Sequence, residues 1–163
     1  LFFLSFLFIG ALGGYGIYRY IREEFLYGDS KTFNYSYNYN VMSIDLTENF
    51  EQTKEEGFVT VMTSDDVKVY VTCEKDELRF PDYYNSLEGY AKLVISNNHL
   101  GDTEIHTKDD LTYFNYISGD CYYYAFVYEY EDDFWMIQFE VSEENRMKYH
   151  YLILDWADSV SFE

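Results

Sequence analysis

Two cysteines and three histidines are the residues of widest chemical range in this chain. Cys73 and Cys121 lie near the ends of two expected strands. In an oxidising compartment they could form a disulfide, which would stabilise the fold by roughly 4 kcal/mol. Two buried thiols are an equal alternative, because the sequence does not give the order of the strands. Neither cysteine belongs to a Cys-x-x-Cys pair, so a redox or zinc motif is not supported.

The histidines and carboxylates do not follow the spacing of a known metal or catalytic motif. His99, His106 and His150 are far apart in sequence, and His-Glu-x-x-His does not occur. The acidic clusters Asp65-Asp66, Asp109-Asp110 and Glu129–Asp133 lack the alternating pattern of a calcium loop. Weak cation binding at Glu129–Asp133 is one interpretation, and a solvated hairpin tip is the favoured one. We therefore expect no catalytic residue, no metal centre and no cofactor.

Motifs for nucleophilic catalysis and phosphate binding are missing as well. The sequence contains no Gly-x-Ser-x-Gly and no Gly-x-Gly-x-x-Gly. A loop over residues 74–85 carries Phe80, Tyr83 and Tyr84 beside the single proline. These three rings are a weak candidate for partner contact, since loop aromatics more often pack on their own domain.

The charge of the chain limits its partners. The net charge is −19, and all charged side chains lie beyond Tyr18. Such a domain repels nucleic acid phosphates and anionic lipid headgroups, which argues against a DNA or RNA partner. A basic protein partner, a cationic ligand or a metal ion remains compatible with this charge. The simpler alternative is that the acidic surface only keeps the domain soluble.

The first eighteen residues carry no charge and predict a membrane anchor. As a helix they would span about 27 Å, close to the roughly 30 Å of a bilayer core. Their Leu, Ile and Phe side chains favour insertion by roughly 3 to 6 kcal/mol. We predict a single transmembrane helix over residues 1–19. Its anchoring side chains are Leu1, Phe2, Phe3, Leu4, Phe6, Leu7, Phe8, Ile9, Leu12 and Ile17.

A cleaved signal peptide is the main alternative to an anchor, because Ala11-Leu12-Gly13 offers small residues for cleavage. Arg19 and Arg22 follow the apolar stretch, and the positive-inside rule taken alone places the domain in the cytoplasm. The sequence opens on Leu1 and not on Met. We expect upstream residues, whose charges could reverse that orientation.

The remaining pattern predicts a linker over residues 20–38 and one globular domain over 39–163. Alternation from Phe33 to Val41 could already belong to an edge strand. Helices are expected at 86–98 and 142–158, with Ser86 and Ser142 as N-caps. The expected strands are 41–46, 58–63, 67–73, 103–107, 112–117, 122–131, 134–141 and 159–163. Together they predict an α+β fold, with an antiparallel sheet of about six to seven strands and two packed helices.

Several short strings along the domain resemble the PsbP and Mog-type family in their order and spacing. They are Met42-Ser43-Ile44-Asp45-Leu46 with Phe50, Ser86-Leu87-Glu88 with Tyr90-Ala91, Phe134-Trp135 with Gln138-Phe139, and Trp156-Ala157 with Ser159-Val160 and Phe162. Thr47 stands where the family usually has a proline. The resemblance implies an α/β/α sandwich and a non-catalytic accessory or binding role. It carries over no functional residue.

We therefore expect a bacterial single-pass membrane protein whose domain lies outside the cytoplasm and binds a protein partner without catalysis. The extracytoplasmic placement follows the resemblance, because many bacterial relatives join one membrane anchor to one such domain. An enzyme acting on a cell-surface polymer is an alternative. An ion-dependent accessory or assembly factor is another.

Overall fold

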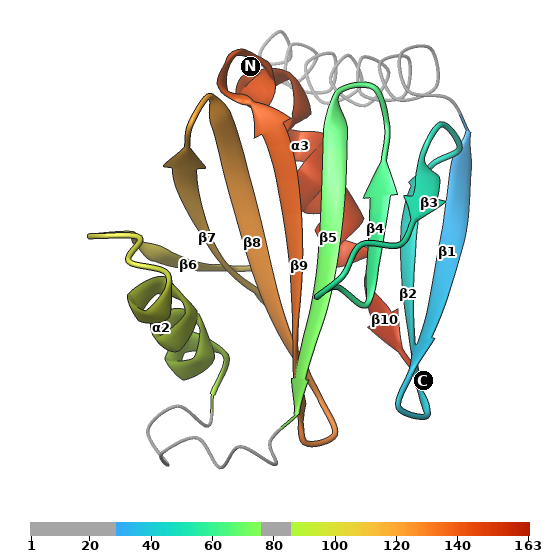
Figure 1. The fold of residues 1–163 in the computed structure, drawn as a ribbon, viewed down its shortest axis with the longest axis horizontal. Helices are drawn as coiled ribbons and strands as arrows, with labels where there is room; N and C mark the ends of the chain where they lie inside the picture. The colour runs from blue at the N-terminus through green and yellow to red at the C-terminus, as the bar shows by residue number, and fades with distance from the viewer. Residues whose placement is uncertain (1–28, 76–85) are drawn as a thin grey trace, which may run out of the picture.

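The computed structural model describes residues 29–75 and 86–163, which form two antiparallel sheets and two helices (Figure 1). The expected anchor over residues 1–19 lies outside these ranges, as do Phe80, Tyr83 and Tyr84. None of the helices in the described ranges has both the length and the apolar character needed to span a membrane.

The larger sheet has seven strands in the order β3-β4-β5-β9-β8-β7-β6, and every neighbouring pair is antiparallel. Its central strands are long and joined by short loops, as the alternating runs and turn residues predict. The strands are β3 (Glu51–Thr53), β4 (Thr60–Thr63), β5 (Val67–Lys75), β6 (Ile105–Lys108), β7 (Leu111–Ser118), β8 (Cys121–Tyr130) and β9 (Asp133–Ser142).

The smaller sheet has three strands and joins the two ends of the described chain. β2 (Asn40–Thr47) lies between β1 (Ser30–Tyr37) and β10 (Ser161–Phe162). Beyond β10, Glu163 and Val41 exchange two backbone hydrogen bonds of 2.8 and 2.9 Å. The expectation of one sheet is therefore corrected to two.

The expected linker over residues 20–38 is also corrected, because β1 occupies most of its second half. Phe33 and Tyr35 are buried in the main core, while their neighbours in the strand are exposed. A period-two pattern with one buried face holds the segment in the sheet as a strand.

One face of the seven-stranded sheet is covered by β1, β2 and helix α3 (Arg146–Asp158). α3 packs against β9, β2 and β8, and Figure 1 shows it behind the sheet. Ser142 does not cap α3 as expected. Its backbone still pairs with Cys121 in the sheet, and a 3-10 turn, η3 (Glu143–Asn145), comes before the helix.

Helix α2 (Leu87–Asn97) covers part of the opposite face, against β6, β7 and β8. Ser86 caps it as predicted, since its hydroxyl accepts a 3.0 Å hydrogen bond from the Gly89 amide. Tyr90 and Ala91 of α2 are buried and belong to a second hydrophobic core with Phe114 and Phe134. Figure 1 shows that α2 leaves the upper part of this face without a helix. The helices thus lie on opposite faces of the larger sheet.

Candidate functional site

A hollow lies at one edge of the seven-stranded sheet, where β6 stops and β7 continues. Ile105, the first residue of β6, pairs with Phe114, but β7 runs on to Ser118. The segment over residues 98–104, between α2 and β6, forms the other side of the hollow, together with His106 and Tyr122. The hollow has a volume of about 700 Å³. Protein pockets that bind small ligands have similar volumes.

The segment over residues 98–104 is held by a specific turn after α2. His99 and Gly101 adopt left-handed backbone conformations, with φ of 55° and 69°. The Leu100 amide donates to the Ile95 carbonyl at 3.0 Å, which closes the end of the helix. The Thr103 hydroxyl then donates to the Leu100 carbonyl at 2.7 Å. These bonds place the carboxylates that follow at the mouth of the hollow.

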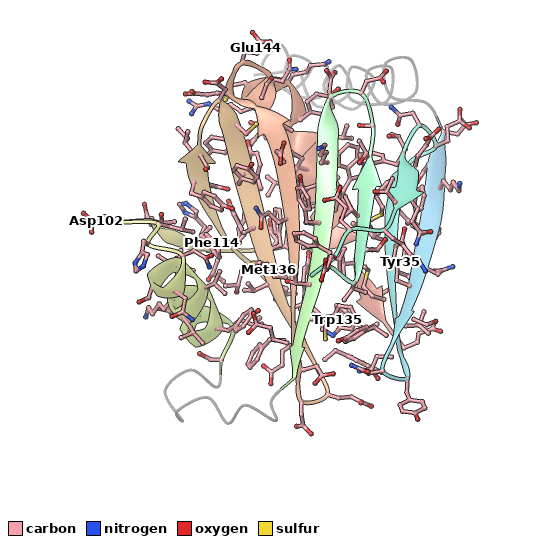
Figure 2. All side chains as sticks on the ribbon, in the orientation of Figure 1. Tyr35, Asp102, Phe114, Trp135, Met136 and Glu144 are labelled. Atoms are coloured by element: carbon pink, nitrogen blue, oxygen red, sulfur yellow. The ribbon has the colours of Figure 1, made fainter. Side chains whose placement is uncertain are left out.

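The lining of the hollow is mixed in charge and chemistry. Asp102 and Glu104 supply carboxylates, and Tyr116 and Tyr122 supply aromatic rings. Figure 2 shows Asp102 at the outer end of its segment. The Asn115 side-chain oxygen is buried and has no hydrogen-bond partner among the described residues. Such a lining suits a ligand that brings a positive charge and hydrogen-bond donors.

A cluster of tyrosines around Glu140 lies next to the hollow on the same sheet. The hydroxyls of Tyr70 and Tyr123 both donate to Glu140 Oε2, at 2.9 and 3.1 Å. The Cys121 thiol donates to Glu140 Oε1 at 3.6 Å. Burial first, and then the Glu140 carboxylate, raises the pKa of both tyrosines. Their hydroxyls therefore stay protonated and act as donors at neutral pH.

Tyr116 connects this cluster to the hollow. Its ring stacks on Tyr123, with ring centres 4.8 Å apart and planes at 7°. Its hydroxyl accepts a 2.6 Å hydrogen bond from the Gln138 amide. Burial raises the pKa of Tyr116. A ligand in the hollow would therefore touch a ring that is fixed from both its face and its hydroxyl.

Tyr122 connects the hollow to α3 on the other face of the sheet. The Arg146 guanidinium lies over the Tyr122 ring, 5.3 Å from its centre. The Tyr122 ring also packs on Tyr124, whose hydroxyl lies 3.3 Å from His150 Nδ1. Burial raises the pKa of Tyr124 to about 12 and, with Lys108 nearby, lowers that of His150. This wall is therefore rigid.

The two cysteines are not joined by a disulfide. Cys73 pairs with Trp135 of β9, whereas Cys121 pairs with Ser142 at the other end of that strand. At roughly 3.3 Å per residue the two positions are about 23 Å apart along β9. Their partners in β9, Trp135 and Ser142, are an odd number of residues apart, so the two cysteines lie on opposite faces of the sheet. The alternative with two thiols is the one that the structure contains.

The acidic tip at Glu129–Asp133 contains the end of β8, the two-residue loop Glu131-Asp132 and the first residue of β9. Across the described ranges, no group of three or more His, Cys, Asp or Glu side chains is arranged to hold a metal ion. Ion binding at this tip stays a prediction.

Sequence reasoning missed the hollow and the Glu140 cluster. Neither has a motif, because each is assembled from segments far apart in the chain. One signal was present: Glu140 and Gln138 alternate with Phe139 and Val141 in β9, so one face of a central strand had to carry polar groups.

The arrangement of the sheet and helices is similar to that of a solved protein. No protein-family profile and no curated protein matches this chain. The solution structure of PsbP from the cyanobacterium Synechocystis superposes with a TM-score of 0.55. The match covers 83% of this chain and 95% of that one, at 13% identity. The fold is PsbP-like. At this identity the likeness shows the fold alone. It confirms the expected PsbP-like α+β fold with a seven-stranded antiparallel sheet and two helices, while the single expected sheet is corrected to two.

Proposed function

We propose that this PsbP-like domain is a non-catalytic binding domain, held outside the cytoplasm by the apolar segment over residues 1–19. Its ligand is a basic segment of a protein partner. The hollow beside β7 carries the proposal, because it joins a volume of about 700 Å³ to carboxylates and fixed aromatic rings. The accessory role that the PsbP and Mog resemblance implies supports the same conclusion.

Charge explains why the ligand is basic. A chain with a net charge of −19 attracts cations over a distance and repels anions. Asp102 and Glu104 provide local partners for Lys or Arg side chains at the mouth of the hollow. The Tyr116 ring stacks on Tyr123 with one face and can contact a cation through the other. Such electrostatic matching chiefly sets the association rate and the choice of partner.

A photo-crosslinking amino acid at Thr103 tests the binding role in the full-length chain in intact cells. The matched control is Thr53, which is exposed on β3 at the far edge of the same sheet. We expect one protein adduct from Thr103 and none from Thr53. The adduct should weaken when about 0.5 M salt screens the charges before irradiation. No adduct, or equal adducts at both positions, would contradict the proposal.

Protease treatment of intact cells tests the placement separately. An extracytoplasmic domain is digested while the cells remain closed, and the anchor stays in the membrane fraction. A domain that is protected until lysis would reject this placement, whatever the crosslinking result.

A further inference from the structure

The backbone of β7 has an open edge beside the hollow. β6 and β7 are joined by the two-residue loop Asp109-Asp110, and β7 and β8 by Gly119-Asp120. In a two-residue hairpin the residues that flank the loop exchange hydrogen bonds, and the bonding direction then alternates along each strand. Ser118 therefore bonds toward β8, whereas Leu111 bonds toward β6. Counting along β7 from either loop assigns the same bonding direction to each of its residues.

It follows that Asn115 and Ile117 direct their N–H and C=O groups away from β8. β6 begins at Ile105, opposite Phe114. Phe114 bonds toward β8, so this pair is held by the positions on either side of it, and the outward N–H of Asn115 faces the carbonyl of Glu104. Within residues 29–75 and 86–163, no other backbone group bonds to Ile117. The hollow lies on this side of β7, and both residues line it.

This edge lacks the usual protection against strand pairing. Proteins shorten their edge strands or place charges and prolines on them. The outer strands β3 and β6 are only three and four residues long. Residues 115–118 read Asn-Tyr-Ile-Ser, without charge or proline, and Ile117 is 52% exposed. An exposed, uncharged edge beside a hollow is a template for an added strand.

We propose that an extended basic segment of a protein partner adds to β7 as a strand, pairing with residues 116–118 where β6 no longer covers β7. The inference rests on the proposed binding function and names its mode. Backbone bonds to Ile117 hold the segment. Asp102, Glu104 and the Tyr116 ring select for Lys or Arg. A second copy of this chain is disfavoured, because two chains of net charge −19 repel each other.

The test uses the full-length chain in detergent micelles and an eight-residue peptide of alternating valine and lysine as the probe. With the ¹⁵N-labelled protein, we expect the amide of Ile117 to exchange more slowly when the peptide is added. The Tyr113 amide serves as the internal reference, since it already bonds to β6. A peptide with N-methyl groups on every residue has no N–H on either edge, so it cannot pair as a strand and should not protect the Ile117 amide.

Two substitutions at one position separate backbone pairing from side-chain contact. Ile117→Pro removes only an outward N–H, which the β7–β8 ladder does not use, so the strand is kept. Ile117→Ala removes the exposed side chain and keeps the N–H. We expect Ile117→Pro to weaken peptide binding about tenfold and Ile117→Ala no more than about twofold. Far-ultraviolet circular dichroism confirms that both variants are folded.

Equal affinities for the two variants, or binding without protection of Ile117, would overturn strand addition. In that case a loss of binding in Asp102→Asn/Glu104→Gln would still support the proposed function. If the two carboxylate changes have no effect and Thr103 gives no crosslink, the proposed function fails as well. Protection that rises with protein concentration and needs no peptide would assign the edge to a second copy, and would also overturn the inference.

Discussion

Asp66, in the turn between β4 and β5, links this turn to helix α3 through hydrogen bonds. Its Oδ2 accepts hydrogen bonds from Lys148 Nζ at 2.8 Å and from the Tyr149 hydroxyl at 2.6 Å. The hydrogen bond from Lys148, followed by that from Tyr149, lowers the pKa of Asp66. Burial raises the pKa of Tyr149 to about 12, so its hydroxyl remains a donor. The junction holds a helix to a sheet through a half-exposed carboxylate.

Tyr149→Phe should lower the free energy of unfolding by about 1 kcal/mol, because it removes one hydrogen bond to a charged acceptor and keeps the ring. Urea titration followed by tryptophan fluorescence measures the change. Tyr151→Phe is the control, since Tyr151 lies on the same helix and is 58% exposed. A loss of the same size in both variants would show that the bond to Asp66 adds no stability.

His150 makes the stability of the domain depend on pH. Burial, and next the charge of Lys108, lowers its pKa below the ordinary histidine value of 6.5. Tyr124 and Tyr151 contact the ring, and Arg146 lies one helical turn earlier. The unfolded chain therefore binds a proton more readily than the folded one. The stability from neutral His150 is present above pH 6.5 and is lost as the pH falls from there through the folded pKa.

His150→Gln should therefore lose less stability than the wild type between about pH 7.5 and 5.5, because glutamine does not titrate. Urea titrations at the two values give the difference for each protein. His99→Gln is the control for histidine substitution, since His99 is exposed in the segment after α2. An identical pH dependence in wild type and His150→Gln would contradict the assignment.

The hairpin of β6 and β7 turns through two residues in left-handed conformations. Asp109 and Asp110 have φ of 49° and 67°, which is the geometry of a type I′ turn. Aspartate tolerates this region but at a cost, whereas glycine adopts it freely. The β6–β7 hairpin beside the hollow therefore has a turn whose residues are less favourable for its conformation than glycine.

Asp110→Gly should raise the free energy of unfolding by about 0.5 kcal/mol, because it relieves the left-handed strain and removes one of two adjacent like charges. Thermal unfolding measures the gain. Asp120→Gly removes the same charge at a loop position without positive φ, and it should bring no gain. An equal gain in both variants would assign the effect to charge and not to backbone strain.

At the scale of elements, the sequence predicted what local chemistry controls. Alternation predicted the strands β4 to β9, turn residues predicted the β4–β5 hairpin and the meander of β7, β8 and β9, and Ser86 predicted the start of α2. The division into two sheets was not predictable, because no local signal tells β2 to pair with β10 and not with β4. β3 was also missed. It has three exposed residues and so shows no buried alternation.

The candidate site could not be predicted for a related reason. Its residues follow no motif, and the hollow exists because β6 is shorter than β7. The length of β6 is set by the turn after α2, where His99 and Gly101 take left-handed conformations. Only the glycine gives a sequence signal for such a turn. The charge, in contrast, was readable from composition, and it left a basic protein partner among the compatible alternatives.

At the scale of the whole molecule, like-charge repulsion opposes the compact state. Raising the salt concentration from about 0.1 to 1 M shortens the screening length from about 10 to 3 Å, so the melting temperature should rise. The triple variant Glu129→Gln, Glu131→Gln, Asp132→Asn carries less charge at the β8–β9 tip. It should gain less from salt than the wild type does. Equal gains would show that repulsion at this tip does not limit stability.

The pairing of β10 with β2 also fixes the order in which the fold can be completed. Phe162 pairs with Met42, and its ring packs on Trp135 and Tyr130. The ribosome makes the β1–β2 hairpin early, but the third strand of its sheet arrives last. Contacts so distant in sequence slow folding. A nascent chain of this design stays incompletely folded until Phe162 has been synthesised and can pair with Met42.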